Sequence, residues 1–251
     1  MTQPTTATQP TTGTRTTNNT QPHWETLSVG SIVTGLPAAA ALFRAHRVDF
    51  CCGGHKLLGD VLAEANQSPA AIVPQLDLLA QEADRMSRET DHAGMPDVRL
   101  AAHIDQKHHT YMHRALPHIG KLSETVLKAH GRNHPELFRV HSLFGQLRAE
   151  LEQHLIKEEV SLFPLYGKPE ADSSTVMLPV IRELRAEHEA AGTLLKDLRH
   201  LTQDYTVPAD GCATWQTLYE ALEEMEGDLF EHIHLENNIL FERHDKLGKG
   251  E

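Results

Sequence analysis

The feature that most constrains this chain is a helical motif that occurs twice. His154 is followed by an aliphatic residue, by Glu158 and by a Leu-Phe pair, and the same pattern begins again at His232, 78 residues later, with Glu236. Internal repetition at a fixed distance indicates a duplicated structural unit. His and Glu four residues apart lie on one face of a helix, one turn apart. The repeat therefore predicts two equivalent helices that each present a His/Glu pair.

The helix that precedes each copy of the motif also takes part in the repeat. His109 and His188 are 79 positions apart, and each is followed by Leu seven residues later. Apolar residues recur at helical spacing through this half of the chain, with Gly or Pro at the joins. Short connections are typical of an up-down-up-down bundle. We therefore predict four long antiparallel helices, at about residues 97–130, 135–166, 174–203 and 213–244.

The His/Glu pairs occur on otherwise apolar stripes, which predicts that they face the bundle interior. A buried carboxylate beside a buried imidazole is costly unless it is paired or bound to a metal. Two carboxylates from opposing helices could bridge two ions, and four imidazoles would then give each ion two terminal ligands. Nitrogen and oxygen ligation inside a four-helix bundle suits iron or manganese, whereas zinc usually prefers a closed tetrahedral site. The predicted set is His109, His154, Glu158, His188, His232 and Glu236.

A single His-x-x-x-Glu pair is most often a surface pair. The prediction of a buried metal site therefore depends on the occurrence of two such pairs at a fixed distance. The other histidines of the bundle are interpreted as solvated or helix-end residues, except that His113 stays open because it follows His109 by four. These residues are His108, His118, His130, His134, His141, His200 and His244.

Amino-acid composition separates the residues before the bundle into a tail, a small domain and a linker. Thr, Gln, Pro, Asn and Gly make up almost all of the first 22 residues, which predicts a disordered tail without a function of its own. The following 64 residues are apolar and rich in Ala, which predicts a small helical domain. The expected boundaries are a tail at 1–22, a helical domain at 23–86, a polar linker at 87–96 and the bundle at 97–246.

Three helices are expected in the small domain. One begins near Pro37, and a second spans His55 to Ala65. Ser68-Pro69 is a candidate cap for the third, whose exact start Pro74 leaves open. Cys51 and Cys52 lie between the first two, followed by two glycines.

Adjacent cysteines close only a strained disulfide ring, and a thiolate near a helix N-terminus has a lowered pKa. Cys51 and Cys52 are thus candidates for a redox or metal-transfer pair, or alternatively small residues packed in a tight turn. Cys212, before the fourth helix, is interpreted as a small buried residue.

Charge and cysteine content narrow the class of protein. The formal net charge is −12, which argues against nonspecific binding to nucleic acid or to an anionic membrane. Three cysteines form no disulfide framework, no apolar run is long enough to span a membrane, and no signal peptide is recognisable. We therefore expect a cytoplasmic protein.

Two segments carry a resemblance to known proteins. The run Glu150-Leu151-Glu152-Gln153-His154 and the run from His232 to Phe241 resemble a hemerythrin-like domain. The segment Asp49-Phe50-Cys51-Cys52-Gly53-Gly54, with Pro37 to Phe43 before it, is similar to the small N-terminal domain of the iron–sulfur cluster repair di-iron proteins. The resemblance covers about residues 24–246.

The resemblance implies the same six ligands, with Glu158 and Glu236 as bridging carboxylates, and places Glu150 and Glu187 along the path to the metals. The cofactor would be two non-haem iron ions with an oxo or hydroxo bridge. The implied function is the repair of iron–sulfur clusters damaged by nitrosative or oxidative stress, by supply of iron from a labile site. Damaged iron–sulfur proteins and a small gas, NO or O2, are the implied partners, and a homodimer is left open.

Other functions remain as alternatives. A hemerythrin-like O2 or NO sensor or carrier would not need the cysteine domain, and reduction of NO at the iron pair would make the protein an enzyme as well as an iron donor. A ferritin-like oxidase requires two Glu-x-x-His helices, and the bundle offers only Glu231 with His234. A purely structural bundle leaves the inward His/Glu set unexplained.

Overall fold

The computed structural model describes residues 23–85, 92–166 and 176–244. The predicted tail at 1–22 and part of the predicted linker lie outside these residues. Within them the fold is helical, apart from an isolated antiparallel bridge between Ser28 and Leu57. The prediction of an all-α protein is confirmed. Among the described helices, none combines the length and the apolarity that a membrane span requires.

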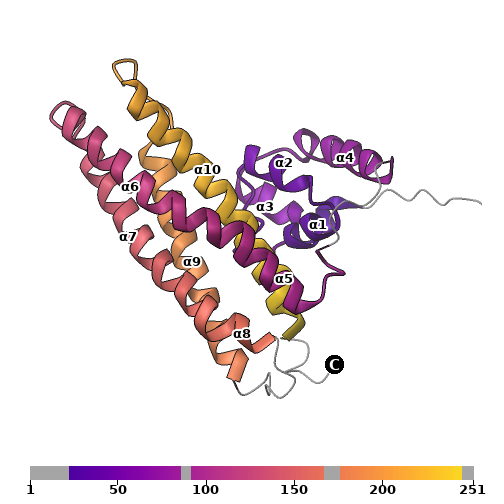
Figure 1. Cartoon of the computed structure of the whole chain (residues 1–251). Coiled ribbons are helices and arrows are strands. Elements are labelled where there is room, and N and C mark those ends of the chain that lie inside the picture. Colours follow the sequence, from indigo (N-terminus) through magenta and orange to yellow (C-terminus); the bar gives the residue numbers. More distant parts are fainter. Residues whose placement is uncertain (1–22, 86–91, 167–175, 245–251) are drawn as a thin grey trace, which may run out of the picture.

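Four long helical rods form an elongated bundle (Figure 1). α6 packs beside α7 and α10, and α7 packs beside α9, as expected for consecutive antiparallel helices. The first rod comprises α5 (Asp97–Ile104), a π-helical turn (Asp105–His109) and α6 (Thr110–His130); the second comprises α7 (Glu136–Lys157), a π turn (Glu158–Leu162) and α8 (Phe163–Tyr166); the third is α9 (Leu178–Leu201); the fourth comprises α10 (Ala213–Leu235) and a π turn (Glu236–Leu240).

The inward stripes of these helices fill the bundle with aliphatic side chains, and Trp215 closes the core toward one end. Its ring meets Tyr219 edge-to-face, with centroids 5.9 Å apart. A second apolar cluster, around Leu100, Leu184 and Phe241, fills the opposite end. The His/Glu set lies between these two apolar layers.

The N-terminal unit contains the three expected helices and one more. α2 (Ala39–Ala45), α3 (Leu58–Glu64) and α4 (Val73–Arg85) lie where helices were predicted. Ser68 caps only a single 3-10 turn, and α4 begins at Val73, with Pro74 in its first turn. The additional helix is α1 (Val29–Gly35), which sequence analysis did not predict because its β-branched residues and two glycines are poor helix formers. Its stability comes from the Ser28 side chain, which accepts the Ser31 N–H, and from burial of its apolar face.

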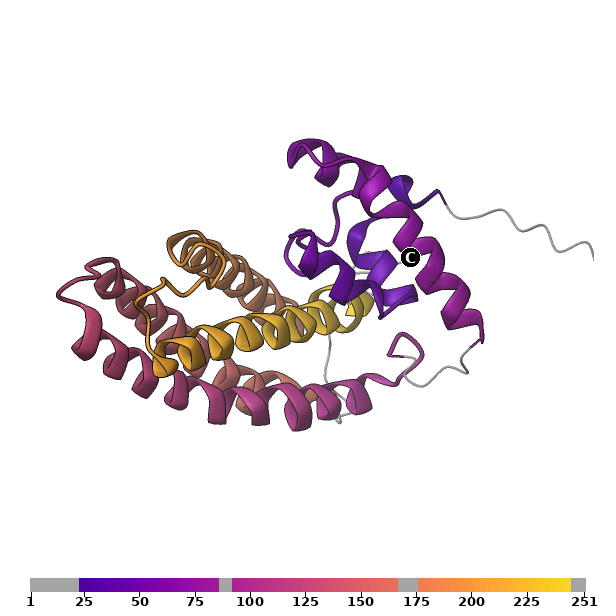
Figure 2. The ribbon, with the colours of Figure 1, turned by 90° about the horizontal axis from the view of Figure 1, so that it is seen from above.

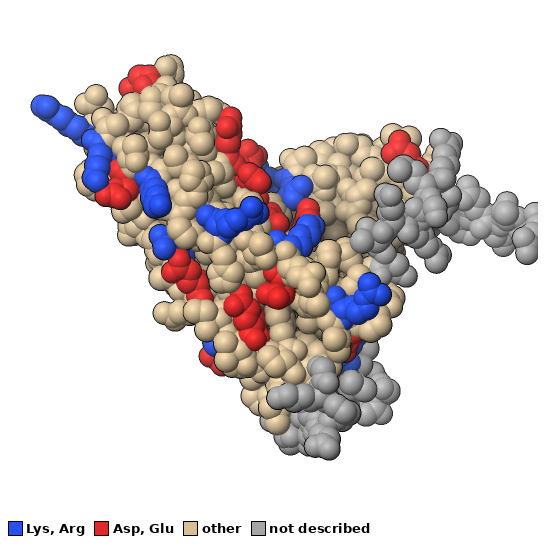
Figure 3. Space-filling view, in the orientation of Figure 1, with Lys and Arg blue, Asp and Glu red and all other residues tan. Residues whose placement is uncertain are grey.

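This unit packs against α9 and α10 of the bundle (Figures 1 and 2). The Phe50 ring lies edge-on to Phe230 at 5.9 Å, and Arg44 donates hydrogen bonds to the Glu231 carboxylate and the Gly227 carbonyl, both at 3.1 Å. Between the unit and the bundle lies a cleft of about 860 Å³. Acidic and basic side chains gather over this part of the surface (Figure 3).

Candidate metal centre

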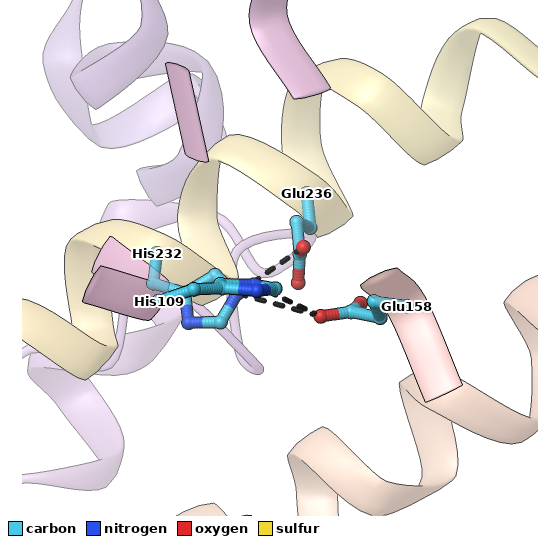
Figure 4. A group of neighbouring side chains, drawn as sticks. All are labelled: His109, Glu158, His232 and Glu236. Carbon is cyan, nitrogen blue, oxygen red and sulfur yellow. Dashed lines mark ion pairs between the residues drawn. The ribbon is translucent and has the colours of Figure 1, made fainter. Parts of the chain in front are cut away.

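The structure brings the six predicted residues together from all four rods. Each is at most 3% exposed. They form two groups whose ligand atoms lie within 4.8 Å of one another, and both groups contain Glu158 and Glu236. His109 and His232 complete one group, drawn in Figure 4, and His154 and His188 complete the other. Two carboxylates shared by two pairs of imidazoles is the arrangement expected of a two-metal site.

Three of the six residues lie in π turns. His109 ends the first such turn, and Glu158 and Glu236 begin the second and third. A π turn contains one residue more than an α-helical turn and changes the direction of the side chains beyond it, and such turns occur frequently at functional sites. The repeat of the sequence is therefore also a repeat of local backbone geometry.

The imidazole Nε2 atoms point toward the two carboxylates. Oε2 of Glu158 lies 3.3 Å from Nε2 of His109 and 3.4 Å from Nε2 of His154. Oε2 of Glu236 lies 3.1 Å from Nε2 of His188, and its Oε1 lies 3.2 Å from Nε2 of His232. Four nitrogen atoms and two carboxylates thus face one small interior volume.

Hydrogen bonds at the opposite ring nitrogen orient three of the four histidines. The Nδ1–H of His109 donates to Glu159 at 3.0 Å, that of His154 to Glu187 at 2.8 Å, and that of His188 to Asn237 at 3.0 Å. Such outer partners fix the ring and make the inner nitrogen a better ligand.

Glu159 and Asn237 were not among the predicted residues, although the sequence contains a signal for them. Glu159 directly follows Glu158 and Asn237 directly follows Glu236, so the 78-residue repeat extends to them. Glu187 was expected along the path to the metals, and the structure places it against His154. Glu150, expected there as well, is exposed and accepts a hydrogen bond from Gln146 at 2.9 Å.

The repeat is broken at one outer position. Glu187 precedes His188, and the equivalent residue before His109 is His108. His108 donates its Nδ1–H to Asp228 at 3.0 Å and stacks on the His232 ring, with centroids 5.8 Å apart. His232 Nδ1 accordingly has no hydrogen-bond partner among the described residues.

The prediction that His108 is solvated was wrong, because the structure buries its side chain completely. The π turn that ends at His109 packs both consecutive histidines against neighbouring helices. His113, by contrast, is exposed and contacts the Glu159 carboxylate at 2.8 Å, so it belongs to the outer hydrogen bonds of the site.

The interior charges depend strongly on one another. Burial and the neighbouring Glu236 raise the pKa of Glu158, but the surrounding histidines outweigh them and hold it below its ordinary value. Burial likewise opposes ionisation of Glu236, and His232 and His188 keep its pKa well below normal. For His232, burial lowers the pKa, while the two carboxylates raise it to a larger extent. The carboxylates therefore stay ionised in the interior, as metal ligands must be.

Several of these atoms lack hydrogen-bond partners. Both carboxylate oxygens of Glu158 and of Glu236, and Nε2 of His109 and His232, are buried without one in the described part of the chain. A buried polar group without a partner costs about 1–3 kcal/mol, and more if it is charged. Bound cations would satisfy these atoms. The residues therefore fit a pair of metal ions, and a nitrogen and oxygen donor set without thiolate suits iron or manganese.

The cysteine turn lies directly against this centre. Cys52 Sγ lies 3.3 Å from the carbonyl oxygen of His188 and 3.7 Å from Cys51 Sγ, and both cysteines are free thiols. Asp49 accepts the backbone N–H groups of Cys52 and Gly53, both at 3.0 Å. The expectation of a lowered thiol pKa was wrong for Cys51, because burial raises its pKa well above normal.

Cys212 also differs from the prediction. It is exposed and is the N-cap residue of α10, whereas a buried position was expected. Residues at an N-cap precede the packed part of a helix, so the apolar stripe of α10 does not extend to it. A hydrogen bond from His130, together with backbone N–H groups at the helix start, lowers its pKa to about 7.

A four-helix bundle with a buried set of four histidines and two glutamates defines a class of non-haem metal-binding proteins. Consistent with this, residues 100–243 match the model of the Hemerythrin HHE cation binding domain, and residues 26–80 match a domain of unknown function, DUF542.

Two curated proteins are similar to this chain over most of their length. The iron-sulfur cluster repair protein YtfE of Yersinia pseudotuberculosis is 36% identical over 219 residues, which cover 86% of this chain and 95% of that protein. The iron-sulfur cluster repair protein ScdA of Staphylococcus haemolyticus is 30% identical over 219 residues, covering 86% of this chain and 96% of that protein. The chain therefore belongs to the hemerythrin HHE family, within the group that includes these repair proteins, as the sequence resemblance indicated.

Proposed function

We propose that this protein holds two non-haem iron ions and repairs iron–sulfur clusters damaged by nitrosative or oxidative stress by supplying iron. The observation that carries the proposal is the pair of overlapping residue groups that share Glu158 and Glu236. The names of the relatives support repair as the activity. Bound iron would supply an exchangeable, redox-active cation.

Different residues would have different roles in holding the iron ions. Glu158 and Glu236 would bridge the two ions, while His109 and His232 hold one ion and His154 and His188 hold the other. The apolar layers on either side exclude water, and the outer hydrogen bonds hold three of the imidazole rings in place. A site with this ligand count leaves room for a small gas such as NO or O2.

The N-terminal unit would couple the bundle to a client. We propose the division into a domain at 23–86 and a bundle at 97–246, with damaged iron–sulfur proteins as the clients. Cys51 and Cys52 are proposed as a redox or iron-transfer pair, which the contact between Cys52 and the His188 backbone supports. A sensor or carrier of O2 or NO is less well supported, because it gives no role to these thiols.

Iron content and the optical spectrum test the centre. The purified protein should hold two irons per chain. His154→Ala and His232→Ala should each lower the iron content to one or less, because each removes a buried nitrogen that points at the carboxylates. His118→Ala is the control, because His118 is exposed on α6. Normal iron content in both centre variants would refute the assignment.

Recovery of a damaged [4Fe–4S] enzyme tests the repair function. The iron-loaded wild type should restore its activity, and the double variant Cys51→Ser/Cys52→Ser, at equal iron loading, should do so less well. Equal recovery by the two proteins would discard the transfer role of the thiols and leave them as turn residues. No recovery by the wild type would contradict repair itself and favour a sensor or carrier.

A further inference from the structure

The duplicated frame makes the two proposed iron positions directly comparable. His154 and His188, at one position, both donate Nδ1–H to an oxygen acceptor. At the other position His109 has such an acceptor, but His232 Nδ1 has none among the described residues, because His108 replaces the glutamate that the repeat would place there. The two positions thus have equivalent ligand residues, but they differ in the outer hydrogen bonds that hold the histidine rings.

This asymmetry has a consequence for affinity. Loss of an outer hydrogen-bond partner typically costs about 10–100-fold in metal affinity, because the ring is less well oriented and is a weaker ligand. The ion beside His109 and His232 is therefore the more weakly held of the two. A centre that supplies iron needs such an exchangeable ion, and a way for it to leave.

A row of histidines leads away from this weaker position. The His108 ring stacks on His232, the His103 ring lies 6.2 Å from His108, and the His92 ring lies 4.9 Å from His103. His108 is buried, whereas His103 and His92 are partly exposed, so the row runs from the centre to the surface. His103 belongs to α5, which lies beside α10 (Figure 1).

Two buried nitrogen atoms of this row indicate a ligand. The Nε2 atoms of His103 and His108 are buried and have no hydrogen-bond partner in the described residues. Burial, with His92 and His108 nearby, lowers the pKa of His103, which keeps its imidazole neutral and able to bind a cation at neutral pH. Neutral imidazole is a good ligand for first-row divalent metals.

We propose that His108, His103 and His92 form a transfer path for ferrous iron, and that the ion beside His109 and His232 is the one that leaves along it. This proposal rests on the proposed iron centre. The ion moves as Fe²⁺ from one imidazole to the next, so no electron is transferred and no bond other than metal–nitrogen and metal–oxygen bonds is made or broken. The other ion remains with His154, His188 and the two glutamates.

Iron release from the full-length, iron-loaded protein tests the path. From wild type that is loaded with Fe²⁺ and kept free of oxygen, a ferrous chelator in excess should remove two irons in two phases of one iron each, the first at least tenfold faster. His103→Gln should slow the first phase at least fivefold and leave the second phase, the iron content and the unfolding temperature unchanged. His118→Gln is the matched control, and it should release iron like the wild type.

The remaining outcomes decide against the path. An unchanged first phase in His103→Gln, or equal slowing in His118→Gln, would overturn it. A lower iron content in His103→Gln would do so as well, because His103 would then belong to the centre. If that variant does not fold, His92→Gln replaces it, with the same expectation.

Two further results separate this proposal from those on which it rests. Slowing by Cys52→Ser, with normal release from His103→Gln, would place the exit at the cysteine turn and overturn the histidine path. Release of both irons in one phase would overturn the asymmetry alone, whereas a wild type that never holds two irons would overturn the centre and the path together.

Discussion

At the scale of single residues, a hydrogen bond to a histidine of the centre distinguishes two glutamates that form the same ion pair. Glu183 and Glu187 lie one turn apart on α9, and both form an ion pair with Lys157. Only Glu187 also accepts the Nδ1–H of His154, and that hydrogen bond is the main reason for its pKa of about 2. One carboxylate therefore supports the centre, and the other is a surface partner.

We expect Glu187→Ala to weaken iron binding by about 10–100-fold, because the ring of His154 loses its outer partner. Glu183→Ala removes the same surface charge and a Lys157 contact, and should leave iron affinity near that of the wild type. Competition with a chelator of known affinity measures both variants. Equal affinities would show that the orientation of His154 does not depend on Glu187.

The cysteines also differ at this scale. Cys212 is exposed with a pKa of about 7, whereas burial raises the pKa of Cys51. Because the thiolate is the reactive form, alkylation by iodoacetamide at pH 7 should label one thiol per chain rapidly, and Cys212→Ser should abolish this reaction. The rate should fall as the pH drops below 7, since the thiolate becomes protonated. His130→Gln should move this midpoint upward, and a rate that is unaffected by that change would contradict the role of His130.

At the scale of elements, the contact between α1 and the π turn that follows α10 depends on a glycine residue. Gly30 donates its N–H to the Gly54 carbonyl at 2.8 Å, and a Cβ at Gly30 would lie 2.6 Å from the Asn238 side chain. Asn238 itself donates to the carbonyls of Phe50 and Cys51 at 3.2 and 3.3 Å. Close backbone approach here holds the cysteine turn on the bundle.

We expect Gly30→Ala to lower the free energy of unfolding by about 1–3 kcal/mol, because the added methyl group displaces Asn238. Gly35→Ala lies on the same helix with nothing within 4 Å of its Cβ, and should be neutral or stabilising by about 0.5–1 kcal/mol. Denaturant unfolding compares the two. Equal effects would mean that Asn238 can move away from α1 without a loss in the free energy of unfolding.

At the scale of the whole molecule, the centre and the N-terminal unit have separate cores. The unit packs around Phe43 and Phe50, whereas the six residues of the centre and the side chains that accept hydrogen bonds from their imidazole rings lie between residues 108 and 237. Arg243 donates to the carbonyls of His92, Ala93 and Met95, which ties the start of the bundle to its end. The bundle thus contains the proposed ligands and the acceptors that orient their rings, and Cys52 adds a contact to the backbone of His188.

A truncated protein that begins at His92 should fold and bind two irons per chain. Its optical spectrum should match that of the full chain, while its ability to restore a damaged cluster should be lost together with the cysteines. Iron analysis and the repair assay measure the two properties on one sample. Loss of iron on truncation would show that the N-terminal unit supports the centre directly.

Much of this could be predicted from the sequence, because the informative patterns are local. Spacing of four residues places His154 with Glu158, and the 78-residue repeat places His232 with Glu236, whatever the neighbouring helices do. The helical class and the identity of the six central residues follow from these spacings. The long helices followed from apolar periodicity in the same way.

Other properties depended on contacts between elements that are distant in the sequence. Burial of His108 required α10 beside the first π turn, and α1 is stabilised by the apolar surface against which it packs in addition to its Ser28 cap. The exposure of Cys212 and the raised pKa of Cys51 likewise reflect how much protein surrounds each thiol. The sequence by itself determined which groups could bind metal, because spacing along a helix fixes direction; tertiary structure decided their burial, protonation and outer support, because these depend on what other segments place around them.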